Sequence, residues 1–282
     1  MVGVERQCRA RIGMVNYINT APLYEVWQQT IQRPGWRITE AVPSILNQML
    51  FQYELDLGFV SSQEYAAHPH LYKILSDLSI SATGPVGSVF LFSRFEPSKL
   101  SGKLVHLTSQ SQTSVSLVKI ILEEFYRVQP RYVTTEITAD FCAVDDQVSA
   151  VLAIGDDALR LTRAGCYSVR LDLSEVWQQH TGLPFVFAVW AVRREFLHKD
   201  PDCVTEIHRE LLRCIGEGRK NLRSICEIVA PRIPMPTQAC YDYLCAMEYD
   251  LGPRKKKALE EFFSFLIQRG EISDEALPLK IY

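Results

Sequence analysis

The sequence has 282 residues, of which 47% are hydrophobic, 22% charged and 10% aromatic. This length suggests one large or two medium domains, and the apolar fraction excludes an intrinsically disordered chain. Thirty Lys and Arg against thirty-three Asp and Glu leave a formal net charge of −3, so we expect no nucleic-acid partner and no membrane surface as partner. Whatever binds must therefore be selected by a local site.

The segment 1–13 contains no apolar stretch of signal-peptide length, and nowhere do 18 uncharged apolar residues run together. We therefore expect a cytoplasmic protein. Its eight cysteines are expected to act as small core residues, because a reducing cytosol disfavours disulfides. None forms a CxxC motif or lies at metal-ligand spacing from a histidine pair, so no metal site is expected.

Strand and helix patterns alternate over the first part of the chain. An apolar strand is predicted over 11–18, and Thr20 and Pro22 then favour the start of a helix. The next predicted elements are a strand over 36–42, a helix that begins at 43, a strand over 55–60 and a short helix around 65–66. This alternation predicts an α/β domain with a mainly parallel sheet.

A turn-rich run at 81–87 leads into an apolar strand over 88–93, and a second α/β alternation follows. Its predicted elements are strands over 104–107, 151–154 and 168–173 and helices over 113–126 and 157–162. A second long apolar strand is predicted over 185–192.

The rest of the chain is predicted to be helical. Gly216 and Gly218 are expected to break a long amphipathic helix over 204–229 in two. The last helix carries apolar residues from 259 to 267, and the basic run 254–257 at its start is expected to be a solvated face.

The two long apolar strands flank the central α/β block, which predicts a discontinuous layout. We expect one domain of residues 1–93 plus 189–282 and an inserted domain of residues 94–188. Because binding sites in open α/β folds lie at the carboxyl ends of strands, a ligand cleft is expected between the two domains.

The polar run 108–114 lies between a predicted strand and a strongly amphipathic helix. Free N–H groups at a helix start, together with hydroxyls, can bind a carboxylate or phosphate without a cation. An ordinary N-cap needs only one of these residues, so both an anion site and a simple cap stay open. The sequence contains none of the signatures GxGxxG, GxxxxGK[ST], HExxH or GxSxG.

Other polar residues follow the predicted strands. Asn19 comes after the first strand, Ser61 after the third, and Gly155 with Asp156 after the strand over 151–154, while Ser88 begins the strand at the domain crossing. Each residue alone is typical of a turn or a cap. An asparagine side chain both donates and accepts hydrogen bonds, which suits a substrate hydroxyl.

Six runs in this order carry a resemblance to a known family, and it extends from about residue 10 to the C-terminus. They are 17–23 (YINTAPL), 56–65 (DLGFVSSQEY), 80–91, 111–115 (SQTSV), 154–159 (IGDDAL) and 182–190 (GLPFVFAVW). As a set they resemble the chorismate dehydratases of menaquinone biosynthesis. That family has an α/β, two-domain, type-2 periplasmic-binding-protein-like fold with a ligand cleft between the domains.

The resemblance implies dehydration of chorismate to 3-[(1-carboxyvinyl)oxy]benzoate on the futalosine route, with no metal or organic cofactor. Asn19 and Ser88 match the family's motifs and are implied to contact the reacting ring and the leaving hydroxyl. The residues implied to bind substrate are Ser61, Ser111, Thr113, Ser114, Gly155 and Asp156. Glu64 is the acidic residue in a matched loop that could act as base; the substrate's own enolpyruvyl carboxylate is the alternative.

Two other functions stay open at this point. One is 1,4-dihydroxy-6-naphthoate synthase of the same pathway, although the Tyr-x-Asn-Thr-x-Pro-Leu and Val-Ser-Ser runs favour the dehydratase. The other is a non-catalytic protein that binds an aromatic carboxylate, because a fold does not by itself fix a function. The oligomeric state is also left open.

Overall fold

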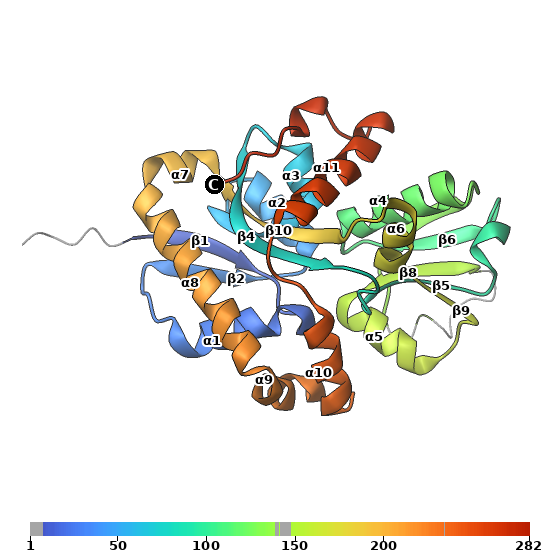
Figure 1. The fold of residues 1–282 in the computed structure, drawn as a ribbon, viewed down its shortest axis with the longest axis horizontal. Coiled ribbons are helices and arrows are strands. Elements are labelled where there is room, and N and C mark those ends of the chain that lie inside the picture. The colour runs from blue at the N-terminus through green and yellow to red at the C-terminus, as the bar shows by residue number, and fades with distance from the viewer. Residues whose placement is uncertain (1–7, 139–140, 142–147, 234) are drawn as a thin grey trace, which may run out of the picture.

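The computed structural model describes residues 8–138, 141, 148–233 and 235–282. Cys142 and the N-terminal residues 1–7, which entered the expectations above, lie outside this part. Two five-stranded sheets lie side by side, and helices cover both (Figure 1). Both sheets are mixed, whereas the strand–helix alternation predicted mainly parallel ones.

The first sheet has the strand order β2-β1-β3-β10-β4. Strands β1, β2 and β3 are parallel, and β10 runs antiparallel to both of its neighbours. The strands are β1 (Ala10–Met14), β2 (Trp36–Glu40), β3 (Leu57–Ser61), β4 (Tyr72–Ala82) and β10 (Phe185–Arg193). The helices between them are α1 (Ala21–Thr30), α2 (Pro43–Phe51) and α3 (Ser62–Ala67), with a 3-10 turn η1 (Ile18–Thr20) before α1.

The second sheet has the order β7-β6-β8-β5-β9. Here β6, β7 and β8 are parallel and β5 is antiparallel to both of its neighbours. The strands are β5 (Val89–Ser93), β6 (Leu104–Thr108), β7 (Arg131–Thr135), β8 (Ala150–Ile154) and β9 (Val169–Asp172). The helices are α4 (Gln112–Ile120), which continues as a π-helical turn over Ile121–Phe125, α5 (Gly155–Ala164) and α6 (Leu173–Thr181).

The chain changes sheet at places that differ from the predicted boundaries. Strand β5 lies in the second sheet, although the division at 93/94 assigned it to the first domain. All of β10 lies in the first sheet, although the division at 188/189 cuts through it. An apolar pattern shows that a strand is buried on both faces but does not identify its partner strands, which explains the error.

The C-terminal helices pack mainly on the first sheet (Figure 1). They are α7 (Arg194–Lys199), α8 (Pro201–Lys220), α9 (Leu222–Val229), α10 (Thr237–Ala246) and α11 (Pro253–Gln268). The long helix is divided in two as predicted, but the break lies at Asn221 between α8 and α9, and α8 runs through Gly216 and Gly218. A Cβ at residue 218 would lie 1.7 Å from the carbonyl oxygen of Pro22, so this glycine permits close packing of α8 on α1.

Two expectations about side chains are corrected by the packing. Lys255 in the basic run is only 5% exposed and forms ion pairs with Glu248 and Asp250, so it is not part of a solvated face. Cys8 and Cys203 form a disulfide, because the residues before β1 lie beside the first turn of α8 with a Cα–Cα distance of 5.4 Å. Three other cysteines are free and buried as expected: Cys214, Cys226 and Cys240.

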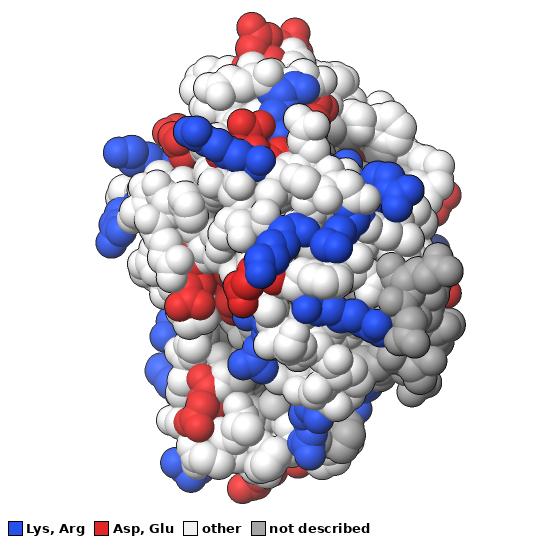
Figure 2. All heavy atoms as spheres, turned by 90° about the vertical axis from the view of Figure 1, so that its right-hand side faces the viewer, with Lys and Arg blue, Asp and Glu red and all other residues white. Residues whose placement is uncertain are grey.

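Charged side chains of both signs lie on the side of the second sheet (Figure 2). Figure 2 shows basic and acidic side chains on that face, interspersed among uncharged residues. Within the described part of the chain, no helix is long and apolar enough to span a membrane.

Candidate active site

A cavity lies where the carboxyl ends of the strands of both sheets meet. The space free of protein atoms there is about 580 Å³, part of which is open to solvent. Its polar wall comes from both halves: Asn19 follows β1 and Ser61 ends β3 in the first sheet, and Ser111, Ser114 and Gly155 follow strands of the second. The apolar wall comprises Val15, Pro43, Phe59, Val60, Ile80, Val86, Val89, Ile154, Phe187 and Ala188.

The structure brings most of the predicted site residues to this cavity. Those that line it are Asn19, Ser61, Ser88, Ser111, Ser114 and Gly155. Thr113 and Asp156 do not line it, although their neighbours in sequence do.

Asn19 lies in the turn η1, directly before α1. The Thr20 hydroxyl does not cap α1 as the sequence suggested, but donates to the carbonyl oxygen of Val15 at 2.7 Å. The Asn19 side-chain oxygen Oδ1 is buried and has no hydrogen-bond partner among the described residues. A buried acceptor without a partner costs free energy, so this amide is suited to receive a hydrogen bond from a ligand.

Ser88 lies on the segment that crosses from β4 to β5. Its backbone carbonyl accepts from the Gly155 N–H at 2.7 Å, which ties it to the start of α5. The backbone N–H groups of Val86 and Gly87 donate to the Asp172 carboxylate, which also caps α6. The Ser88 hydroxyl oxygen accepts from the Tyr243 hydroxyl at 2.8 Å.

The start of α4 confirms the cap and still leaves polar atoms at the cavity. Ser111 Oγ accepts from the Ser114 N–H at 3.2 Å, which makes Ser111 the N-cap. The Ser111 hydroxyl donates to Ser114 Oγ at 3.1 Å, and both residues line the cavity. The positive end of the α4 dipole and these hydroxyls therefore face the same space.

Thr113 and Asp156 join the two halves of the molecule instead of facing the cavity. Thr113 Oγ1 accepts from the Gln63 N–H at 3.0 Å, and Asp156 Oδ1 accepts from the Ile18 N–H at 3.2 Å. Burial raises the pKa of Asp156, and the hydrogen bond from Ile18 opposes that effect. These contacts hold the cleft closed over the cavity.

Tyr17 adds a third contact of this kind and also lines the cavity. Its hydroxyl donates to Gln110 Oε1 at 2.8 Å across the cleft. Burial raises the pKa of Tyr17, with nearby Asp156 and Asp157 acting in the same direction, so the phenol stays neutral. Gly155 has a positive φ of 54°, and a Cβ there would lie 3.0 Å from the Tyr17 ring, so only glycine lets α5 approach this closely.

The cavity has a mostly apolar wall with several polar groups and no charged side chains. Among the residues of the described chain that line it, none is Asp, Glu, His, Lys or Arg. In the same part of the chain, no group of three or more His, Cys, Asp or Glu side chains could hold a metal ion. An anion in this cavity would be held by hydroxyls, backbone N–H groups and helix dipoles.

Glu64 does not line the cavity, although it follows Ser61 by three residues. It belongs to α3, and its buried carboxylate accepts from the Tyr72 hydroxyl at 3.0 Å, with His68 Nε2 at 3.8 Å. Burial raises the pKa of Glu64 to about 7. In this arrangement the Glu64 carboxylate is bonded within the first half of the molecule and is not part of the cavity wall.

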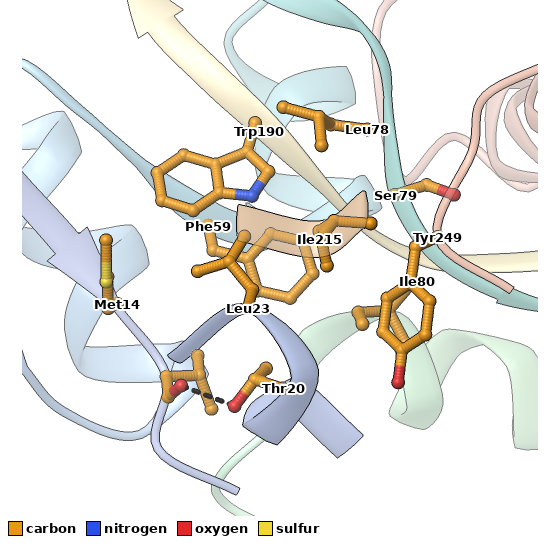
Figure 3. Close-up of a pocket in the computed structure, with 11 residues that line it drawn as sticks. Met14, Thr20, Leu23, Phe59, Leu78, Ser79, Ile80, Trp190, Ile215 and Tyr249 are labelled. Atoms are coloured by element: carbon orange, nitrogen blue, oxygen red, sulfur yellow. Dashed lines mark hydrogen bonds between the residues drawn. The ribbon is translucent and has the colours of Figure 1, made fainter. Parts of the chain in front are cut away.

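A second cavity adjoins the first behind η1 and shares Val15, Phe59 and Ile80 with it. Figure 3 shows its wall of apolar side chains, with Trp190, Leu78 and Ile215 among them. The Tyr249 hydroxyl points away from Trp190 and Leu78 and donates to the carbonyl oxygen of Asn19 at 3.0 Å.

Sequence reasoning missed three tyrosines that contact this site. Tyr17 belongs to the run 17–23, so the family motif contained the signal. Tyr243 and Tyr249 lie on and after α10, a helix that the sequence patterns did not separate from its neighbours, and they follow Ser88 by more than 150 residues. No local signal in the sequence connects them to Ser88 or Asn19.

Comparison with known proteins identifies the family. A family model described as "Menaquinone biosynthesis" matches residues 10–268. The chain belongs to this family. A chorismate dehydratase of Thermus thermophilus is 34% identical over 267 residues, which cover 89% of this chain and 93% of the relative. A chorismate dehydratase of Campylobacter jejuni is 29% identical over 192 residues, 66% of this chain and 70% of that one.

Solved structures of other proteins have the same fold as this member of the menaquinone-biosynthesis family. The periplasmic aliphatic sulphonate binding protein of Escherichia coli matches with a TM-score of 0.67 at 12% identity, over 98% of this chain and 92% of that one. The predicted type-2 periplasmic-binding-protein-like fold is therefore confirmed, as is the resemblance to the menaquinone-pathway family.

Proposed function

We propose that this protein is a chorismate dehydratase, which removes water from chorismate to give 3-[(1-carboxyvinyl)oxy]benzoate for menaquinone biosynthesis. The observation that carries the proposal is the 34% identity to the Thermus thermophilus enzyme over 89% of the chain. The site geometry supports it, because the two residues that the family motifs single out, Asn19 and Ser88, line one cavity.

Chorismate carries two carboxylates, and the cavity offers neutral donors for them. In our proposal, the ring carboxylate or the enolpyruvyl carboxylate lies at the start of α4, against Ser111 and Ser114. Ser61 adds a hydroxyl from the first sheet. Because water is largely excluded from a closed cleft, these hydrogen bonds are stronger than they would be in water.

The reaction breaks a C–H bond and a C–O bond on neighbouring ring carbons, forms a double bond between these carbons and makes the ring aromatic. The proton leaves the ring carbon that bears the enolpyruvyl ether, which is vinylogous to the ring carboxylate, so the resulting carbanion is stabilised. Its electron pair then expels hydroxide from the neighbouring carbon, and the hydroxide takes up a proton to become water. Ser88 and Asn19 would hydrogen-bond to the leaving oxygen and the reacting ring, where charge develops.

We propose the enolpyruvyl carboxylate of the substrate as the base. No Asp, Glu or His among the described residues lines the cavity, and the Glu64 carboxylate accepts from the buried Tyr72 hydroxyl. The carboxylate is attached through the ether to the same ring carbon that loses its proton, so it needs no separate binding step to reach the proton.

The direct test is incubation of the purified protein with chorismate, with ultraviolet detection and mass spectrometry of the product. We expect an aromatic product with the mass of chorismate less one water. Activity on cyclic dehypoxanthine futalosine without activity on chorismate would instead identify the 1,4-dihydroxy-6-naphthoate synthase. Tight binding of chorismate without turnover would identify a non-catalytic binding protein.

Chorismate is the partner that this proposal names. A cytoplasmic location and the lack of nucleic-acid and membrane partners remain predictions from the sequence. The Cys8–Cys203 disulfide offers a check on the location, because alkylation of freshly lysed cells measures whether these thiols are oxidised in place.

A further inference from the structure

One segment of the C-terminal part reaches both Ser88 and Asn19 from outside the cavity. It consists of α10 and the extended residues that follow it. The extended residues pair with β4: the Ser81 N–H donates to the Glu248 carbonyl at 2.9 Å, and the Glu248 N–H donates back to Ser81 at 3.0 Å. The Ser79 N–H donates to the Tyr249 carbonyl at 2.8 Å. The segment is thus fixed to the first sheet by backbone hydrogen bonds.

Tyr243 projects from α10 onto the crossing segment that carries Ser88. Its hydroxyl donates to Ser88 Oγ at 2.8 Å, and Tyr243 does not line the cavity. A Cβ at Gly87 would lie 3.4 Å from the Tyr243 ring, so the ring packs directly on the backbone beside Ser88. Burial raises the pKa of Tyr243, so the phenol keeps its proton and remains a donor.

Tyr249 makes a similar hydrogen bond, but to the backbone of Asn19. It is 3% exposed, and its hydroxyl donates to the Asn19 carbonyl oxygen at 3.0 Å. This bond fixes the turn η1 while the Asn19 side chain stays free, since Oδ1 has no partner among the described residues. One segment therefore supports two residues that come from different parts of the chain.

We propose that Tyr243 and Tyr249 are positioning residues for the dehydration: Tyr243 directs the Ser88 hydroxyl proton into the cavity, and Tyr249 fixes the backbone that presents the Asn19 amide. The inference rests on the proposed function. It assigns a catalytic use to α10 and the residues after it, which touch no substrate.

Hydrogen-bond geometry gives the physical reason. A serine hydroxyl has one proton and two acceptor lone pairs. Tyr243 occupies one lone pair from outside the cavity, and among the described residues no acceptor is recorded for the Ser88 proton. The proton is thus free to point toward the leaving hydroxyl. Chains of hydrogen bonds also polarise one another, which makes Ser88 a stronger donor as negative charge develops.

The test compares kcat and KM for chorismate in Tyr243→Phe and in the unmodified protein. The substitution keeps the ring that packs on Gly87 and removes only the hydroxyl. We expect kcat to fall about tenfold, the size of one lost hydrogen bond, with KM changed less than twofold. The matched control is Tyr241→Phe on the same helix, whose ring lies by Arg223, away from the cavity, and which should retain full activity.

A double-mutant cycle separates positioning from a general loss of structure. If Tyr243 acts through Ser88, then adding Tyr243→Phe to Ser88→Ala should lower kcat no further. Adding Tyr243→Phe to Asn19→Ala should still lower it about tenfold, because the two residues are not bonded. By the same reasoning, Tyr249→Phe should lower kcat in the unmodified protein and have no effect in an Asn19→Ala background.

Three results would overturn the inference. One is an unchanged kcat in Tyr243→Phe while the unmodified protein converts chorismate. Another is an equal tenfold loss with and without Ser88, which would show that Tyr243 acts on the structure in general. The third is failure of the unmodified protein to convert chorismate, which would overturn the proposed function as well. The first two leave the proposed function intact.

Discussion

The two sheets have the same strand arrangement, but the helices that begin at the cavity after equivalent strands are capped differently. Each has three parallel strands followed by an antiparallel one, in the orders β2-β1-β3-β10-β4 and β7-β6-β8-β5-β9. Strands β1 and β6 therefore occupy equivalent places, and so do β3 and β8. The helices α1 and α4 begin after the first pair, and α3 and α5 after the second.

One difference lies in how α1 and α4 begin; in the other pair α3 is capped by Ser61 and α5 has no side-chain cap. Helix α4 is capped by Ser111, so its polar start is satisfied within the second half. Helix α1 has no side-chain cap, and Asn19 before it leaves a buried oxygen without a partner among the described residues. We therefore propose that Ser111 and Ser114 at the start of α4 hold the substrate, and that Asn19 before α1 supplies a hydrogen-bonding group to the reacting ring. In this proposal the reacting part of the cavity is marked by a buried oxygen without a partner among the described residues, Asn19 Oδ1, and not by a titratable side chain.

The strongest test of this difference is removal of the unpartnered amide. Asn19→Ala is expected to lower kcat by about 10²- to 10³-fold, because one oriented hydrogen-bonding group at the reacting atoms is lost. Stability should be nearly unchanged, since the side-chain oxygen Oδ1 has no hydrogen-bond partner among the described residues. Steady-state kinetics and thermal unfolding measure the two effects. Retention of full activity would show that Asn19 is only a turn residue.

The helices after β3 and β8 carry buried carboxylates, Glu64 and Asp156, and neither lines the cavity. The pKa of Glu64 is raised to about 7, above its ordinary value of 4.5, so the folded protein holds this proton more tightly than the unfolded chain. Protonated Glu64 therefore stabilises the folded state relative to the ionised form. This stabilisation is fully present below about pH 4.5 and is lost as the pH rises through about 7.

Glu64→Gln should remove this pH dependence and still accept the hydrogen bond from Tyr72. The free energy of unfolding of the unmodified protein should fall between pH 5 and pH 8 by roughly 2 kcal/mol more than that of the variant, since one pKa unit corresponds to about 1.4 kcal/mol. Urea unfolding at both pH values measures this. An equal pH dependence in both proteins would contradict the assignment.

The approach of α5 to Tyr17 depends on Gly155. Gly155→Ala introduces strain at a positive φ and a contact of 3.0 Å with the Tyr17 ring. Gly165→Ala is the matched control at the other end of the same helix, because its φ is 67° and a Cβ there would meet nothing within 4 Å. We expect Gly155→Ala to cost about 1 to 3 kcal/mol more than Gly165→Ala in denaturant unfolding, and to raise KM. Equal costs would show that the ring moves aside freely.

The smallest effect is expected at the α4 cap. Ser111→Ala should lower stability by about 1 kcal/mol through loss of the bond to the Ser114 N–H, and should raise KM more than it lowers kcat. Chemical unfolding and steady-state kinetics check both parts. A loss of kcat as large as that of Asn19→Ala would show that the starts of α1 and α4 do not differ in role.

Local sequence patterns predicted the elements that bring the site together. Strands β1, β3 and β8 and the polar residues after them were recognisable from period and turn chemistry, which are local properties. These local patterns were enough to predict that Asn19, Ser61 and Gly155 lie at the cavity. Ser111 and Ser114 followed from the helix start.

What escaped prediction depends on contacts between distant segments. The sheet to which β5 and β10 belong, the turn of Thr113 toward Gln63, and the bond from Tyr243 to Ser88 are set by packing of residues far apart in the chain. Gly218 also shows this, since its role is close contact with Pro22 and not a helix break.

The pH dependence of kcat at saturating chorismate tests the central claim most directly, namely that uncharged groups and the substrate's own carboxylate carry the reaction. A carboxylate of ordinary pKa, about 3 to 4, is ionised throughout the working range. We therefore expect kcat to stay constant between about pH 5.5 and 8.5. A fall in kcat at acid pH with an apparent pKa near that of Glu64, about 7, that disappears in Glu64→Gln would contradict the account.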